Sequence, residues 1–175
     1  MNVAVIPARG GSKRIPRKNI KEFCGKPMIA WPIEVAKQSK LFEHILVSTD
    51  DEEIKAIAEQ YGAEVPFLRP SGLADDYTPT IPVIRHTIMW FDQNKQCPDL
   101  VCCLYPTAPF VSDIGICVAK DKLVETGSDF VFPVARYPFP IQRALRIDEN
   151  DRVRMFAPNM FTKRSQDLDE AYHDA

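Results

Sequence analysis

The segment Ile6–Asn19, called here the glycine loop, holds residue types that bind polyphosphates. It follows the apolar run Val3–Ile6 and contains two glycines and five cations, with no acid between Arg9 and Lys18. Glycine lets backbone N–H groups approach anionic oxygens, and arginine and lysine neutralise their charge. Because ligands bind beyond the carboxyl ends of strands in open α/β sheets, we predict an anion site here.

The loop differs from two familiar phosphate-binding patterns. It lacks the glycine, four-residue spacer and Gly-Lys-Ser/Thr of a Walker loop, and the chain contains no G-x-G-x-x-G. The simpler alternative is a solvated basic turn. Pro7 and Pro16 argue against a free turn because each fixes a backbone angle.

Composition limits the class of protein. The chain has 175 residues, 45% of them hydrophobic, and a net charge of −2, which suits one globular domain with a sizeable core. A basic loop on a mildly acidic chain favours a small anionic ligand over nucleic acid. The three histidines, His44, His86 and His173, are not clustered, which disfavours a zinc site or a Ser-His-Asp triad.

The cysteines indicate a reducing compartment. Their number is five, no C-x-x-C occurs, and Cys102 and Cys103 lie within an apolar run. We therefore expect buried free thiols in a cytoplasmic protein. No apolar run approaches the length of a membrane span, and Met1 leads directly into the first strand, so we expect no signal peptide.

Strand-like and helix-like patterns alternate along the chain and predict an α/β fold with a doubly wound, mostly parallel sheet. Asp50 looks like a helix N-cap, with Glu53 completing a capping box and Gly62 ending the helix. The apolar run Leu100–Leu104 suits the centre of the sheet. Strands are expected at 3–6, 44–48, 64–68, 100–104 and 129–135, and helices at 27–38, 51–61, from Thr80, and at 112–124.

The pattern changes after Ala135. Tyr137–Pro140 interrupts it, and Arg143–Ile147 and Arg152–Phe156 flank a turn as the arms of a hairpin. We expect residues 1–135 to form an α/β domain and residues 136–175 a protruding excursion that packs on another surface, such as a second subunit. The alternative is a flexible flap.

The glycine loop resembles the opening signature of the acylneuraminate cytidylyltransferase (CMP-sialic acid synthetase-like) family, whose members activate acidic sugars as CMP conjugates. The order Pro-Ala-Arg-Gly-Gly-Ser-Lys-x-x-Pro-x-Lys-Asn carries the resemblance, and it extends over essentially the whole chain. Within the family the chain looks most like the pseudaminic acid cytidylyltransferases. Further matching segments are Gly25–Trp31, Val47–Asp50, Arg69-Pro70, Pro106–Pro109 and Arg164–Gln166.

The resemblance implies a Rossmann-like nucleotide-diphospho-sugar transferase fold and a cytidylyltransferase that couples CTP to a nine-carbon acidic sugar, with release of pyrophosphate. It also implies Mg²⁺, whose ligands are not assigned, CTP binding by residues 1–135, and sugar-acid binding and homodimer formation by residues 136–175. Arg9 and Lys18 would be catalytic and lie nearest the triphosphate. The nucleotide site would further include Ala8, Gly10, Gly11, Ser12, Asn19 and Arg69, and the sugar site Tyr105, Thr107, Ala108, Gln142, Arg164 and Gln166.

Two departures from the family pattern leave alternatives open. Tyr105 stands where neuraminate enzymes carry a glutamine that touches the sugar, which points to another sugar. Family members continue beyond the position of Ala175 with a late acidic motif, so we expect the C-terminus to be truncated. The alternatives are a CMP-N-acetylneuraminate or CMP-legionaminate synthetase, or a truncated nucleotide-binding module without turnover.

Overall fold

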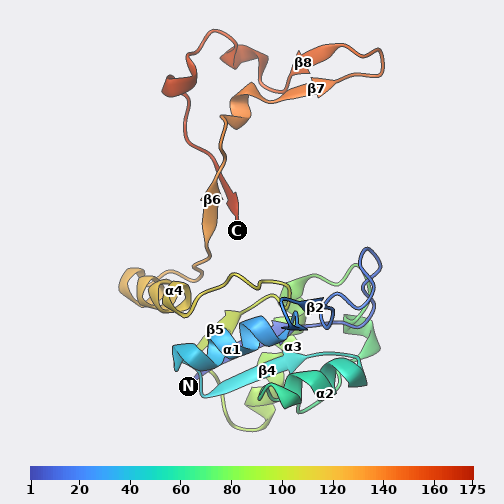
Figure 1. Cartoon of the computed structure of the whole chain (residues 1–175). Helices are drawn as coiled ribbons and strands as arrows, with labels where there is room; N and C mark the ends of the chain where they lie inside the picture. The colour runs from blue at the N-terminus through green and yellow to red at the C-terminus, as the bar shows by residue number, and fades with distance from the viewer. The chain divides into compact units, whose positions relative to one another are not determined.

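Strand β1, Asn2–Pro7, lies at the centre of a parallel sheet (Figure 1). In this computed structural model of residues 1–175, β1 pairs with β4, His44–Ser48, on one side and with β5, Leu100–Cys103, on the other. The chain divides into two compact units, Met1–Val118 and Ala119–Ala175, and the sheet belongs to the first.

Both faces of the sheet are covered, because side chains of a strand alternate between faces. On one face, Ala4 and Ile6 pack with apolar residues of α1, Ala30–Ser39, and α2, Glu52–Gln60. On the other face, Val3 and Val5 pack with Phe91 of α3, Thr80–Gln93. Helices on both sides of a parallel sheet confirm the predicted α/β fold class.

Helix α3 starts at Thr80 as predicted, whereas α1 starts at Ala30 rather than at residue 27, since Pro27 is extended and pairs with Glu22. Pro32 lies in the first turn of α1, where its missing N–H is tolerated. The prediction that Asp50 caps α2 is wrong, since the N-cap is Asp51, whose carboxylate accepts hydrogen bonds from the backbone N–H groups of Glu53 and Ile54. Adjacent aspartates offer the same sequence signal, and the helix begins one residue later than expected, at Glu52.

Three strand predictions need correction. Residues 64–68 form only isolated parallel bridges, Leu46 to Glu64 and Thr49 to Leu68. Strand β5 is an edge of the sheet rather than its centre. The segment 129–135 is not a strand of this sheet, and only Val134–Arg136 is extended as β6, which pairs antiparallel with β9, Tyr172–Asp174. The apolar content of a segment does not show whether it joins the sheet or which strand it pairs with.

The second unit is built from short pieces. Beyond the β6–β9 pair, the predicted hairpin is confirmed as β7, Leu145–Ile147, paired with β8, Val153–Met155. Helix α4, Asp113–Thr126, begins in the first unit and ends in the second.

The remaining elements of both units are short. They are β2 (Glu22–Phe23), β3 (Lys26–Pro27), and single 3₁₀ turns at Ser71–Leu73, Ile141–Arg143, Pro158–Met160 and Ser165–Asp167.

No helix of the structure has the length and apolar character needed to cross a bilayer.

Candidate active site

A cavity of about 170 Å³ opens beyond the carboxyl ends of β1 and β5 and beside the start of α3. It is the position where ligands bind in open α/β sheets. The cavity brings together predicted residues that are far apart in sequence, namely Arg9, Lys18, Asn19, Arg69, Tyr105 and Thr107. Pro7, residues 78–80, Val83 and Pro106 complete its wall.

Arg69 is a buried cation in this cavity, with 6% of its surface exposed. Its guanidinium donates to the Ser48 hydroxyl at 3.1 Å and to the Ser48 backbone oxygen, and forms no ion pair with an acid. Burial lowers the pKa of Arg69 from its usual value. Arginine keeps its charge under such shifts, so the cavity wall carries a positive charge that is not neutralised by contact with a carboxylate.

Two cations of the glycine loop share the cavity with Arg69. Lys18 is half-buried and forms no ion pair in the structure. Arg9 uses its Nη1 alone, donating to the backbone oxygen of Asp75 at 2.6 Å and contacting Asp76 Oδ1 at 2.7 Å. Its other guanidinium nitrogens have no protein partner. Together the three side chains supply positive charge suited to a polyphosphate.

Asn19 lines the cavity and forms hydrogen bonds both within the glycine loop and to the segment that follows it. Its amide donates to the Arg9 backbone oxygen at 2.9 Å, and its backbone oxygen accepts from the N–H of Ile29 at 2.8 Å. The residue is 2% exposed, yet its side-chain oxygen Oδ1 has no hydrogen-bond partner. A buried acceptor without a partner is costly, so a ligand that donates to Oδ1 would gain binding energy here.

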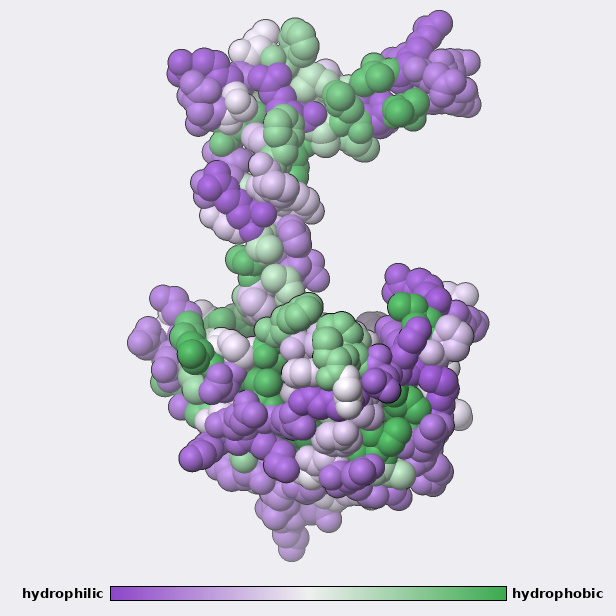
Figure 2. Space-filling model, viewed as in Figure 1, coloured by the Kyte–Doolittle hydropathy of each residue, from purple (hydrophilic) through white to green (hydrophobic).

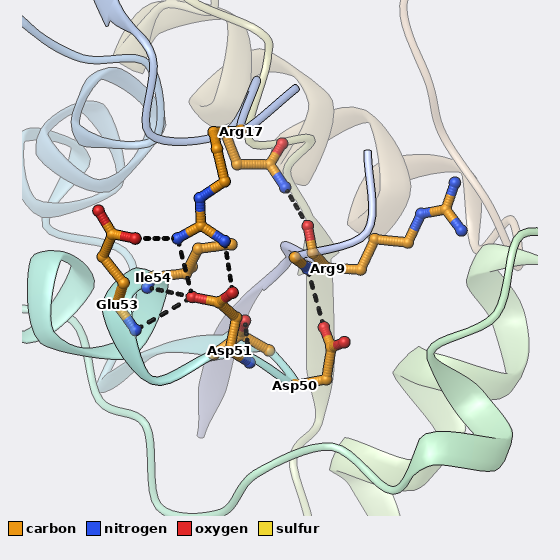
Figure 3. Close-up of polar contacts among 9 residues, drawn as sticks. Arg9, Arg17, Asp50, Asp51, Glu53 and Ile54 are labelled. Carbon is orange, nitrogen blue, oxygen red and sulfur yellow. Dashed lines mark hydrogen bonds and ion pairs between the residues drawn. The ribbon is translucent and has the colours of Figure 1, made fainter. Parts of the chain in front are cut away.

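The glycine loop is held from one side by the start of α2 (Figure 3). Arg17, whose φ of 55° is left-handed, donates to both carboxylate oxygens of Asp51 at 2.5 and 3.1 Å and also pairs with Glu53. The Arg17 guanidinium beside it lowers the pKa of Asp51, and the capping hydrogen bonds reinforce this. One carboxylate therefore caps a helix and fixes the loop.

Gly10 is required by packing against this same acid. A Cβ added to Gly10 would lie 2.6 Å from Asp51 Oδ2 and 3.0 Å from its Cβ, which is too close for any larger residue. The Gly10 backbone N–H donates to Asp50 Oδ1 at 2.9 Å, as Figure 3 shows. That N–H is thus already occupied, and the Ser12 N–H donates to the Gly10 backbone oxygen at 2.9 Å, so of these three backbone N–H groups only that of Gly11 has no protein partner.

Comparison with known proteins decides the family. The sequence model described as "Cytidylyltransferase" matches residues 3–161. The chain belongs to the cytidylyltransferase family. It is 46% identical to a pseudaminic acid cytidylyltransferase of Campylobacter jejuni over 174 residues, which is 99% of this chain and 75% of that protein. It is 47% identical to a CMP-N,N'-diacetyllegionaminic acid synthase of Legionella pneumophila, over 62% of this chain and 47% of that one.

The cytidylyltransferase fold is also seen in solved structures. CMP:2-keto-3-deoxy-manno-octonic acid synthetase complexed with CTP superposes with a TM-score of 0.68 at 19% identity, covering 99% of this chain and 71% of the other. At that identity the similarity establishes the fold. The structural similarity confirms the predicted α/β class, and the family match confirms the predicted nucleotidyltransferase activity.

Other predicted residues of this cytidylyltransferase lie outside the cavity lining. Ala8 is buried, Gly11 is exposed, and Ser12 and Ala108 are half-buried. The remaining three belong to the second unit, where Gln142 Nε2 donates to the Asp169 backbone oxygen and Arg164 pairs with Asp167 through two hydrogen bonds of 2.8 and 3.1 Å. Gln166 is exposed.

Several residues that build the site were not predicted. Arg17 was counted only among loop cations, and its left-handed backbone has no sequence signature. The sequence places Thr80 only at the start of a helix, whose N-cap is Pro79, whereas the Thr80 hydroxyl lies 3.1 Å from the Tyr105 hydroxyl and joins α3 to the loop after β5. Asp76 carried no motif at all. The only available signal was the adjacent acids Asp75-Asp76 in a chain that also carries a basic loop.

The titratable residues do not form a metal cage or a cysteine nucleophile. No group of three or more His, Cys, Asp or Glu side chains is placed to hold a metal ion. Near the cavity, Asp50, Asp51 and Asp76 are already engaged by Gly10, Arg17 and Arg9. All five cysteines are free thiols, and burial raises the pKa of Cys102 to about 11, so that thiol stays protonated at neutral pH.

Proposed function

We propose that this cytidylyltransferase couples CTP to pseudaminic acid, giving the CMP-sugar and pyrophosphate. The observation that carries the proposal is the cavity, which holds Arg9, Lys18 and Arg69 together at a strand end. The match to the Campylobacter jejuni relative covers 99% of this chain and supports the sugar, because the match to the legionaminic acid synthase covers only 62% of it.

The reaction needs positioning and charge stabilisation more than covalent chemistry by the protein. The anomeric hydroxyl of the sugar attacks the α-phosphorus of CTP, a new oxygen–phosphorus bond forms, and the bond to pyrophosphate breaks. Arg9 and Lys18 contact the triphosphate, with backbone groups at Gly10, Gly11 and Ser12 close by. The hydroxyl proton passes to solvent or to a group that we do not assign.

The nucleoside and the sugar are assigned to different residues. Ala8, Asn19 and Arg69 lie around the cytidine, where the unpaired Asn19 Oδ1 accepts a hydrogen bond from the ligand. Tyr105, Thr107 and Ala108 face the sugar after β5. For Gln142, Arg164 and Gln166 we propose contacts to the sugar acid, with Arg164 suited to a carboxylate.

Mg²⁺ enters this proposal as a companion of the triphosphate. The structure places no group of carboxylates to hold it, and Mg²⁺ bound to nucleotides commonly keeps waters and phosphate oxygens as most of its ligands. When bound, it would neutralise charge on the phosphates.

Pyrophosphate release measures this function directly. With CTP, Mg²⁺ and one sugar acid at a time, we expect the fastest release with pseudaminic acid, slower release with legionaminic and N-acetylneuraminic acids, and none when Mg²⁺ is omitted. Faster turnover with N-acetylneuraminic acid would contradict the sugar assignment. CTP binding without turnover on any sugar would favour a nucleotide-binding module.

We also propose that the chain forms a homodimer through residues 136–175, with residues 1–135 as the CTP-binding domain. The second unit exposes phenylalanines by 62% (Phe139) to 76% (Phe130), and Figure 2 shows hydrophobic residues on its surface. Such patches mark contact surfaces in soluble proteins. The free thiols further support a cytoplasmic location.

Sedimentation velocity tests the dimer. We expect a species of about twice the 19.9 kDa chain mass at micromolar concentration, and its dissociation when Phe139 or Phe156 is replaced by serine. Monomer at every concentration tested would remove the proposal. Phe91→Ser is not a suitable control because Phe91 is in the core, whereas Tyr77→Ser changes an aromatic of the first unit that is 92% exposed and should leave the dimer intact.

A further inference from the structure

A short acidic turn faces the cations of the glycine loop. Asp76 places one carboxylate oxygen on Arg9 and the other on Lys13, so a single acid bridges two loop cations. Its side chain is only 29% exposed. Hydrogen bonding to Lys13, followed by Arg9, lowers the pKa of Asp76, so it is ionised at neutral pH.

The turn that carries Asp76 is built independently of those cations. Asp75 Oδ1 accepts from the backbone N–H groups of Tyr77 and Thr78 at 2.9 and 2.6 Å and from the Thr78 hydroxyl at 2.7 Å. These hydrogen bonds close residues 75–78 into a local turn. Residues 78–80 then continue along the cavity wall. Asp76 is thus presented from a preformed support rather than from a free chain.

The contacts with Arg9 all fall on one end of its guanidinium. Nη1 reaches both the Asp75 backbone oxygen and Asp76 Oδ1, whereas Nε and Nη2 have no partner in the protein. A guanidinium has five donors in a rigid plane, and its Nε–Nη2 edge can bind two oxygens of a phosphate at once. In Figure 3 the Arg9 side chain extends away from the Arg17–Asp51 pair.

We propose that Asp76 is a positioning residue for the nucleotidyl transfer: with the Asp75 backbone oxygen it holds Nη1 of Arg9, so that the Nε–Nη2 edge faces the phosphates of CTP. This inference rests on the proposed function, in which Arg9 contacts the triphosphate. It assigns Asp76 a role through Arg9, with no contact of its own to substrate.

The proposal predicts that removing the Asp76 charge changes CTP affinity in the direction opposite to the one expected from simple electrostatics. Removing a negative charge near a triphosphate should tighten binding if Asp76 merely repels the ligand or competes for Arg9. If Asp76 positions Arg9, the neutral isostere Asp76→Asn should instead weaken CTP binding. We expect a loss of roughly tenfold, within the range for residues that share one network, because an uncharged amide holds the guanidinium less firmly.

A double-mutant cycle on CTP affinity tests this role. Calorimetric titration of CTP is made with the wild-type chain, Asp76→Asn, Arg9→Ala and the double variant. We expect Asp76→Asn to weaken binding in the wild-type background and to cause no further loss when Arg9 is absent. Asp92→Asn, an exposed acid on α3, is the matched control for the change of charge and should leave affinity unchanged.

Each other outcome overturns the proposal. Unchanged or tighter CTP binding by Asp76→Asn would exclude positioning, and an equal loss with and without Arg9 would show that Asp76 acts by another route. Thermal melting of each variant separates these results from unfolding. Failure of wild-type turnover would refute the proposed function alone, whereas the binding cycle still reports on Asp76.

Discussion

Replacing Arg9 by alanine should weaken CTP binding by about one to two orders of magnitude, the loss expected for a charge-assisted hydrogen-bonding group. The fold should persist, because Arg9 projects from the glycine loop into the cavity and its protein contacts are confined to the turn at Asp75 and Asp76. Calorimetric titration of CTP measures the affinity, and a thermal melt confirms that the variant is folded.

Two variants distinguish a phosphate contact from a general effect of charge. Arg14→Ala removes a cation from the same loop that does not line the cavity, and it should change CTP affinity by less than about threefold at moderate salt. Arg9→Lys keeps the charge but loses the planar fork, so its affinity should fall between wild type and alanine. Equal affinities for wild type and Arg9→Ala would remove the loop from the phosphate site.

Replacing Asp51 by alanine should impair both stability and nucleotide binding. The variant loses the N-cap of α2, worth about 1 kcal/mol, and the partly exposed pair with Arg17, worth up to about 1 kcal/mol more. Freed from Arg17 pairing, the glycine loop should bind CTP several-fold more weakly, since its cations are no longer preorganised. Urea unfolding followed by circular dichroism gives the first quantity, and titration of CTP the second.

Asp51→Asn separates the two roles of this residue. Asparagine caps helices as well as aspartate does, so α2 should keep most of its stability, while the charge that holds Arg17 is lost. We expect this variant to lose only the contribution of the Arg17 pair in urea, up to about 1 kcal/mol, and to lie near Asp51→Ala in CTP affinity. Glu52→Gln, the neighbouring exposed acid, is the control. If both Asp51 variants bound CTP as tightly as wild type, Asp51 would serve only as a helix cap.

Much of the fold could be predicted because local patterns and tertiary structure agree there. The apolar runs at Val3–Ile6 and His44–Ser48 pair in the parallel sheet, and the hairpin arms around Asp148–Asp151 pair as expected. The segment at 129–135 could not be assigned from its pattern. An apolar run shows that burial is favourable, but it does not specify the partner or the order of strands in a sheet.

The sequence predicted those residues of the candidate site that belong to a recognisable motif. It missed the residues whose place in the site depends on how distant loops come together. Arg9, Lys18 and Arg69 carry charges that the sequence displays directly, and the fold gathers them in one cavity. Arg17 and Asp76 act through partners distant in the chain, Asp51 and Arg9 respectively. Such pairs depend on which loops lie next to each other at the sheet edge, and a single sequence does not show this.

The close approach of Gly10 to Asp51 constrains how this protein can be redesigned. A side chain at position 10 would displace the carboxylate that pairs with Arg17 and begins α2, so three positions in two separate segments behave as one unit. Libraries that vary the loop alone, for example to accept a different nucleotide, would mostly yield chains with a loosened helix. A library that varies positions 10, 17 and 51 together can find compatible combinations of residues that single substitutions cannot reach.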